Sequence, residues 1–201
     1  MNIDGVDYRG MVFLHPMKTA GTSVGVFLRK FIQQRHGEVE IVHMRRHQVP
    51  KEFMWKMGYD DNWFDDMYCL IFVRNPYERL VSFYHHMRQI GGHAEGLCKE
   101  KTFHEFILHK DLKYIVTPMS AYSYYNKNIT NYVVRYEKLD DCVCELIELL
   151  DLGEYANEVW NNSERLMATD HLPYEAYYTP ETKAIAFNTF KEDFITYGYE
   201  A

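Results

Sequence analysis

Residues 11–23 read MVFLHPMKTAGTS, and this stretch predicts a strand, a short loop and the start of a helix. Met11–His15 is an apolar run of strand length, and Pro16 ends it. Beyond the loop, apolar residues recur at the i, i+3, i+4 and i+7 spacing of an amphipathic helix: Val24, Phe27, Leu28 and Phe31. The order of strand, loop and helix is typical of an α/β protein.

The loop between this strand and helix has the features of an anion site. Ala20 and Gly21 are small enough to let backbone N–H groups approach an anion closely. The helix start adds N–H donors and a partial positive charge, and Lys18 adds a full charge. Hydroxyl groups that can donate further hydrogen bonds come from Thr19, Thr22 and Ser23. The other interpretation is an ordinary turn in which Thr22 or Ser23 caps the helix.

The loop differs from the phosphate-binding loop of ATPases and GTPases. That motif has the order G-x-x-x-x-G-K-[ST], whereas Lys18 here precedes Gly21. The order of the residues therefore weakens an interpretation as an ATPase or GTPase.

A second segment, residues 68–84, repeats the pattern. Tyr68–Val73 (YCLIFV) is apolar enough for a strand that is buried on both faces. Arg74 follows at the carboxyl end of this strand, where open α/β sheets bind ligands, and its planar fork suits a phosphate. Ser82 on the next predicted helix can donate to the same group. The alternative is that Arg74 pairs with Glu78 while Ser82 faces solvent.

Together, the two segments predict a pocket for a nucleotide with two anionic ends. They also resemble a known family, the sulfotransferases that use 3′-phosphoadenosine-5′-phosphosulfate (PAPS), and most of all its carbohydrate-type branch. Lys18–Ser23 (KTAGTS) is similar to that family's 5′-phosphosulfate loop, and Arg74 with Ser82 is similar to its 3′-phosphate site. The two motifs together are far more specific than either one alone.

The resemblance extends over nearly the whole chain. Further similar segments follow in the family's order: His47–Phe53 (HQVPKEF), Arg135–Leu139 (RYEKL), Asn161–Ser163 (NNS) and Asp193–Tyr199 (DFITYGY). One departure is that Met17 separates Pro16 from Lys18, where the family usually has proline directly before the lysine. The resemblance implies a single sulfotransferase domain over residues 1–201. Its fold would be a three-layer α/β/α arrangement with a central parallel sheet and a P-loop-like nucleotide-binding topology.

The resemblance also implies a reaction, the transfer of the sulfuryl group from PAPS to a hydroxyl of a carbohydrate or small-molecule acceptor. Charge builds on the leaving phosphate oxygen in a loose transition state, so positioning and electrostatic stabilisation dominate. Lys18 would hold that oxygen, and no metal is required. A general base that works near neutral pH is expected to be a histidine or a glutamate. The first choice is His47, at the start of HQVPKEF, and the alternatives are His43 and His15.

Composition limits the partners of the chain. A formal net charge of −7 argues against general nucleic-acid binding. No apolar run approaches a membrane span, and the first residues lack a signal pattern. The four cysteines lack metal spacing and predict reduced thiols in the cytoplasm. Asp60–Asp66 (DDNWFDD) is more typical of a solvated connection than of a metal site.

The remaining sequence predicts further helices and strands. Pro50–Met57 is expected to be a helix, Tyr132–Arg135 a strand, and the next helix is expected to begin at Asp140 or Asp141. Thr102 predicts a capping box, and Thr179 starts a last helix that carries Phe187, Phe190 and Phe194. Residues 91–96 and 114–128 are predicted long loops. In the second, Tyr122, Tyr124 and Tyr125 are expected to line an acceptor pocket or to form a flap on the core.

Two other functions fit part of the pattern. A P-loop-like nucleotide kinase or hydrolase requires magnesium and an acidic ligand after a core strand, but Tyr68–Val73 runs into Arg74 instead. A nucleotide-binding module without turnover is the third possibility, and the departure at Met17 is compatible with it. The acceptor and the oligomeric state stay open at this point.

Overall fold

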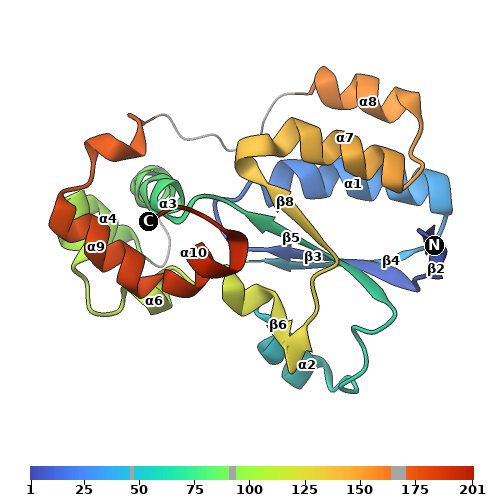
Figure 1. Ribbon diagram of the computed structural model, residues 1–201, viewed down its shortest axis with the longest axis horizontal. Helices are drawn as coiled ribbons and strands as arrows, with labels where there is room; N and C mark the ends of the chain where they lie inside the picture. The colour runs from blue at the N-terminus through green and yellow to red at the C-terminus, as the bar shows by residue number, and fades with distance from the viewer. Residues whose placement is uncertain (46–47, 91–93, 164–170) are drawn as a thin grey trace. The chain divides into compact units, whose positions relative to one another are not determined.

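The computed structural model of the chain describes residues 1–45, 48–90, 94–163 and 171–201 (Figure 1). The chain divides into two compact units. The first unit comprises Met1–Val73 and Ala121–Leu166, and the second comprises Arg74–Ser120 and Met167–Ala201. Each unit is described by itself below.

The first unit is built on a four-stranded sheet. Its strands are β3 (Gly10–His15), β4 (Glu40–Arg45), β5 (Met67–Val73) and β8 (Tyr132–Arg135). They lie in the order β4-β3-β5-β8, and every neighbouring pair is parallel. The predicted α/β class with a central parallel sheet is thereby confirmed.

The strand order has a consequence for ligand binding. The chain passes from β3 to β4 on one side of the sheet, whereas β5 and β8 follow on the other side. Ligands of open α/β sheets bind beyond the carboxyl ends of the strands at such a reversal. The carboxyl end of β3 leads into the Lys18 loop, and the carboxyl end of β5 leads into Arg74.

Helices cover one face of the sheet and bury its apolar side chains. They are α1 (Gly21–His36), α7 (Leu139–Leu149) and α8 (Glu154–Asn161), and α1 and α7 lie over the same face (Figure 1). The core contains residues from both layers, including Phe13, Phe72, Leu28, Leu146 and Trp160. Side chains that alternate onto the opposite face, such as Val12, Leu14 and Cys69, are fully buried as well. Burial on both faces explains why these strands are continuous apolar runs.

Smaller elements complete the first unit. They are the hairpin of β1 (Asn2–Ile3) and β2 (Val6–Asp7), helix α2 (Pro50–Met57), the hairpin of β6 (Tyr124–Tyr125) and β7 (Lys127–Asn128), and the 3-10 turn η2 (Tyr136–Lys138). The predicted bounds of α2 and β8 agree with the structure.

The acidic segment Asp60–Asp66 ties parts of the first unit together. Tyr125 donates its hydroxyl to Asp61 at 2.6 Å, and the Lys127 ammonium contacts Asp65 at 2.5 Å. Arg9 donates from Nε to Asp66 at 2.9 Å, which lowers the pKa of that carboxyl below its usual value. These carboxylates therefore hold the β6–β7 hairpin and the start of β3.

The second unit is helical. It contains α3 (Pro76–Ile90), α4 (Glu95–Glu100), α5 (Phe103–Ile107), α6 (Leu112–Ile115), α9 (Pro180–Thr189), α10 (Lys191–Tyr197) and the 3-10 turn η3 (Tyr174–Ala176). The predicted capping box at Thr102 is present, with Glu105 as its partner. Thr179 starts α9 as predicted, and Thr182 closes a second box.

Several predictions of element ends were wrong. The expected single last helix is two helices, because the backbone at Phe190 (φ −112°, ψ 23°) leaves the helical range between α9 and α10. The residue before α1 is Ala20, not Thr22 or Ser23. The residue before α7 is Lys138, and the two aspartates lie in its first turn, where they favour the helix dipole.

The two predicted loops also contain regular structure. Residues 114–128 include the end of α6, the 3-10 turn η1 (Ser120–Tyr122) and both strands of the β6–β7 hairpin. In residues 91–96, α4 already begins at Glu95, and residues 91–93 lie outside the described residues. Within the described ranges, no helix has the length and apolar character needed to cross a membrane.

Candidate functional site

The loop after β3 holds two residues in a backbone conformation that side chains rarely adopt. Lys18 has a φ of 66° and Ala20 a φ of 65°, both in the left-handed region. Each such residue costs about 1–2 kcal/mol when it carries a Cβ. Left-handed residues that alternate with ordinary ones turn successive N–H groups to one side and make a concave nest for an anion. Strain of this kind is typical of functional loops.

The start of α1 leaves its N–H groups accessible to an anion. Among the described residues, no side chain hydrogen-bonds to the first turn of α1 as a cap, and the first turn has no acidic residue. The first N–H groups of a helix lack partners within the helix and carry a partial positive charge. This helix start therefore favours a bound anion, as the sequence predicts.

Thr19 serves the loop itself. Its side chain is fully buried, and its hydroxyl donates to the Pro16 carbonyl at 2.7 Å. In this structure the Thr19 hydroxyl is thus used within the loop, and its role toward a ligand stays a prediction. The hydrogen bond joins the two ends of a turn that contains Met17 and Lys18, and it thereby fixes the conformation of the Pro-Met-Lys segment.

A pair of histidines lies next to the loop. His15, the last residue of β3, has its Nδ1 atom 3.0 Å from Nε2 of His43 on the neighbouring strand β4. Phe13 packs edge-on against His43, and Phe72 packs against His15. Both imidazoles therefore lie on the face of the sheet that α1 covers.

Two glycines of α1 make room for this pair. A Cβ atom on Gly21 would lie 2.4 Å from Cδ2 of His15, and a Cβ on Gly25 would lie 2.8 Å from Cε1 of His43. The two glycines are one helical turn apart, so each faces one imidazole. Glycine at these positions is what permits both rings to lie directly beneath the helix.

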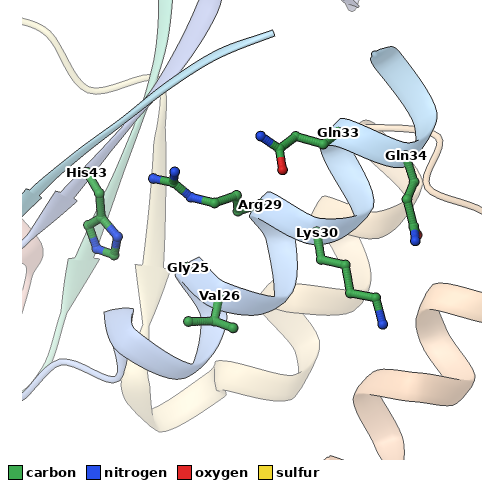
Figure 2. Close-up of a pocket in the computed structure, with 7 residues that line it drawn as sticks. All are labelled: Gly25, Val26, Arg29, Lys30, Gln33, Gln34 and His43. Atoms are coloured by element: carbon green, nitrogen blue, oxygen red, sulfur yellow. The ribbon is translucent and has the colours of Figure 1, made fainter. Parts of the chain in front are cut away.

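A groove opens beside His43. It has a volume of about 870 Å³ and is lined by His43 and the outer side of α1: Gly25, Val26, Arg29, Lys30, Gln33 and Gln34. Figure 2 shows Arg29 extending from α1 toward the strand that carries His43, whereas Lys30 points away from His43. The Arg29 guanidinium also donates to the Ile41 carbonyl of β4 at 3.5 Å. The charges that line the groove are positive, in a chain with a net charge of −7.

The segment after β5 is described within the second unit. Arg74 is buried, and its Nε donates to Glu78 at 3.3 Å. The predicted alternative of an Arg74–Glu78 ion pair is therefore present. Ser82 is buried, so the second part of that alternative, a Ser82 that faces solvent, is wrong. Glu78 and Ser82 lie four residues apart on one side of α3, and Arg74 precedes Glu78 by the same spacing.

A buried network fixes the backbone at Arg74. The Arg74 N–H donates to the sulfur of Met119 at 3.4 Å. Asp193, with no exposed surface, accepts the N–H groups of Met119 and Ser120 at 2.8 Å each. Arg79 lies 3.9 Å from Asp193. Burial raises the pKa of the Asp193 carboxyl, while Arg79 and the two N–H donors oppose that rise.

The other predicted site residues are His47 and three tyrosines. His47, the first residue of its segment, lies outside the described residues. Tyr122 is fully buried, Tyr124 is exposed and Tyr125 is bound to Asp61, so these three do not form one lining. The sequence analysis missed the contact of His15 with His43 and the pair of Arg79 with Asp193. No spacing rule joins residues that are 28 or 114 positions apart.

Comparison of the sequence with known proteins identifies its family. The sequence matches the profile of the sulfotransferase family over residues 3–200. The match covers both units and includes the Lys18 loop, the histidine pair and the Arg74 segment. No curated protein matches the chain in sequence. Because the profile covers nearly the whole chain, this protein belongs to the sulfotransferase family.

Proposed function

We propose that the protein transfers the sulfuryl group of PAPS to a hydroxyl of an acceptor, which is a carbohydrate or another small molecule. One observation supports the proposal most. The loop that resembles the family's phosphosulfate loop has two left-handed residues in front of a helix start that no described side chain caps. Such a loop offers its backbone N–H groups to a bound dianionic group.

The donor is proposed to use both motifs. The loop Lys18–Ser23 would bind the 5′-phosphosulfate through its N–H groups and the Lys18 ammonium. Arg74 and Ser82 would bind the 3′-phosphate, and burial of the Arg74 side chain strengthens a charge-assisted hydrogen bond to it. Glu78, only 33% exposed at its side chain, would exchange part of its contact with Arg74 for that phosphate.

Catalysis would rest on charge stabilisation. As the bond from sulfur to the bridging oxygen breaks, negative charge develops on the leaving phosphate, and Lys18 would lie beside it. The sulfuryl group carries less negative charge than a phosphoryl group, so this proposal needs no metal. The acceptor hydroxyl would lose its proton to a histidine, for which His47, His43 and His15 remain the predicted residues.

The two units are proposed to form one catalytic domain, because a single family profile runs through both of them. A cytoplasmic location is also part of the proposal. The four cysteines occur as free thiols in the described part of the chain, which suits a reducing compartment.

The first experiment is calorimetric titration with 3′,5′-adenosine bisphosphate, with 5′-AMP and ATP plus magnesium as controls. The proposal predicts micromolar binding that requires the 3′-phosphate and is indifferent to magnesium. Preference for ATP with magnesium would contradict it and favour a kinase or hydrolase. Binding of the bisphosphate without turnover of PAPS over a panel of hydroxyl acceptors would indicate a binding module.

A further inference from the structure

We propose that His15 and His43 work as one proton relay, which takes the proton of the acceptor hydroxyl at the loop and releases it into the groove beside α1. This inference rests on the proposed sulfuryl transfer and assigns His15 a role in it. Two observations support it: the contact between the two rings, and the different surroundings of the ring edges that face away from this contact.

The contact between the rings allows one proton between them. His15 Nδ1 and His43 Nε2 are 3.0 Å apart, which is hydrogen-bond distance. One nitrogen must donate and the other accept, so the tautomer of one ring sets that of the other. The rings are tilted by only 34° and their centroids are 5.1 Å apart, so neither needs to turn for the proton to cross.

The outer edges of the rings lie at different places. The Cδ2–Nε2 edge of His15 lies against Gly21, the first residue of α1 and part of the proposed phosphosulfate loop. The Cε1 tip of His43 lies against Gly25, one turn further along, and His43 lines the groove. His15 is 8% exposed, whereas His43 borders an open space of about 870 Å³. The pair thus joins a buried point at the loop to solvent.

The proton balance of the step is complete. The acceptor O–H gives its proton to Nε2 of His15, the acceptor oxygen bonds to sulfur, and the electron pair of the broken S–O bond leaves with the bisphosphate. The Nδ1 proton of His15 passes to Nε2 of His43, and His43 releases its Nδ1 proton to water. Between turnovers, His43 takes up a proton from water at Nδ1, its Nε2 proton returns to Nδ1 of His15, and His15 loses its Nε2 proton, which restores the starting tautomers.

The surroundings favour release of the proton over its retention. Phe13 and Phe72, the aromatic neighbours of the pair, provide no counter-charge. The charged residues that line the groove beside His43, Arg29 and Lys30, are both cations, and Arg29 extends toward His43. A positive charge on His43 is repelled by these cations.

The first test is a histidine-selective ¹⁵N NMR spectrum of the whole chain. A shared proton gives a measurable coupling between Nδ1 of His15 and Nε2 of His43, together with the same tautomer in both rings, either Nδ1–H in each or Nε2–H in each. This readout needs no donor or acceptor, so it judges the relay even if PAPS proves not to be the donor. Different tautomers in the two rings, or no coupling between them, would overturn the relay.

The second test uses variants at the groove end. His43→Gln removes the outer acceptor, and Gly25→Ala displaces His43 without removing it. Both are expected to lower transfer at least about tenfold, a modest share of what general base catalysis contributes. Added imidazole should restore part of the rate of His43→Gln, and affinity for 3′,5′-adenosine bisphosphate should stay unchanged in both.

The matched control is Gln33→Ala, which alters the same groove outside the hydrogen-bonded pair. It is expected to keep the wild-type rate. A wild-type rate in His43→Gln, or a lost rate that imidazole does not restore, would overturn the relay. If the unmodified chain transferred no sulfuryl group, the proposed function would be contradicted. The NMR coupling would then be the test of whether the two histidines share a proton.

Discussion

The loop after β3 and the segment after β5 both follow a central strand, yet they are held in shape by different means. The first relies on its backbone: Lys18 and Ala20 adopt left-handed conformations, and one hydrogen bond from Thr19 closes the turn. The second relies on side chains: Asp193 fixes Met119, and Met119 accepts the N–H of Arg74. A strained backbone presents N–H groups, whereas a side-chain network presents a guanidinium.

This difference predicts different sensitivities to mutation. In the segment after β5, the network is buried, so its loss should unfold the second unit before it affects any ligand. In the loop after β3, the distinctive feature is the backbone conformation at Lys18 and Ala20, so removal of the Lys18 side chain should alter catalysis and leave stability nearly unchanged.

The largest effect is expected for Asp193→Ala. Removal of this carboxylate takes the counter-charge from the buried Arg79 cation and leaves two N–H donors without their acceptor. Loss of one partner of a buried ion pair costs about 3–5 kcal/mol of unfolding free energy. Urea unfolding measures the change. Glu192→Ala, an exposed neighbour on α10, serves as the control and should change stability by less than about 0.5 kcal/mol. Equal stability of the two variants would contradict the role given to the network.

The next effect is expected for Lys18→Ala. The transfer rate should fall by at least about a hundredfold, the scale of losing one donor that stabilises developing charge. Steady-state assays with PAPS measure the rate, and the urea midpoint should remain close to that of the unmodified chain. Lys56→Ala, on the exposed side of α2, controls for the loss of one positive charge. If both variants kept their activity, Lys18 would not be catalytic.

The central architecture could be predicted from the sequence because it depends on local patterns. The bounds of α2 and β8, the parallel sheet and the two helix starts at Thr102 and Thr179 follow from apolar runs and capping residues. The start of α1 could not be predicted in the same way. The preference of Thr22 or Ser23 as a cap was overridden by a loop whose conformation is strained at Ala20.

Residues of the candidate site could be predicted only in part. The loop and Arg74 lie at strand ends, where position in the chain already indicates a role. His43 pairs with His15 because β4 lies beside β3, and the strand order is a property of the whole sheet. Asp193 reaches Met119 across 74 residues, and a sequence pattern with a helical or strand period carries no signal for such a contact.

A smaller effect is expected for Arg74→Ala. Affinity for 3′,5′-adenosine bisphosphate should fall about ten- to a hundredfold, since a hydrogen bond to a charged group contributes about 1.5–3 kcal/mol. Calorimetry measures this fall, and 5′-AMP is the matched control ligand because it lacks the 3′-phosphate. Affinity for 5′-AMP should stay the same. If both ligands lost affinity equally, Arg74 would support the fold of its segment and not the 3′-phosphate.

The smallest effect is expected for Ala20→Gly, and it tests the backbone side of the comparison directly. Glycine removes a left-handed strain of about 1–2 kcal/mol at Ala20 but adds about 0.5–1 kcal/mol of chain entropy in the unfolded state. The two terms leave a gain in stability of no more than about 1 kcal/mol, measurable by urea unfolding. Ala186→Gly, the same change inside α9, has only the entropic cost and the lost methyl packing, so it should destabilise. A loss of stability at Ala20 as large as that at Ala186 would mean that the loop is not strained. Its N–H groups would then owe their arrangement to side-chain contacts, as in the segment after β5.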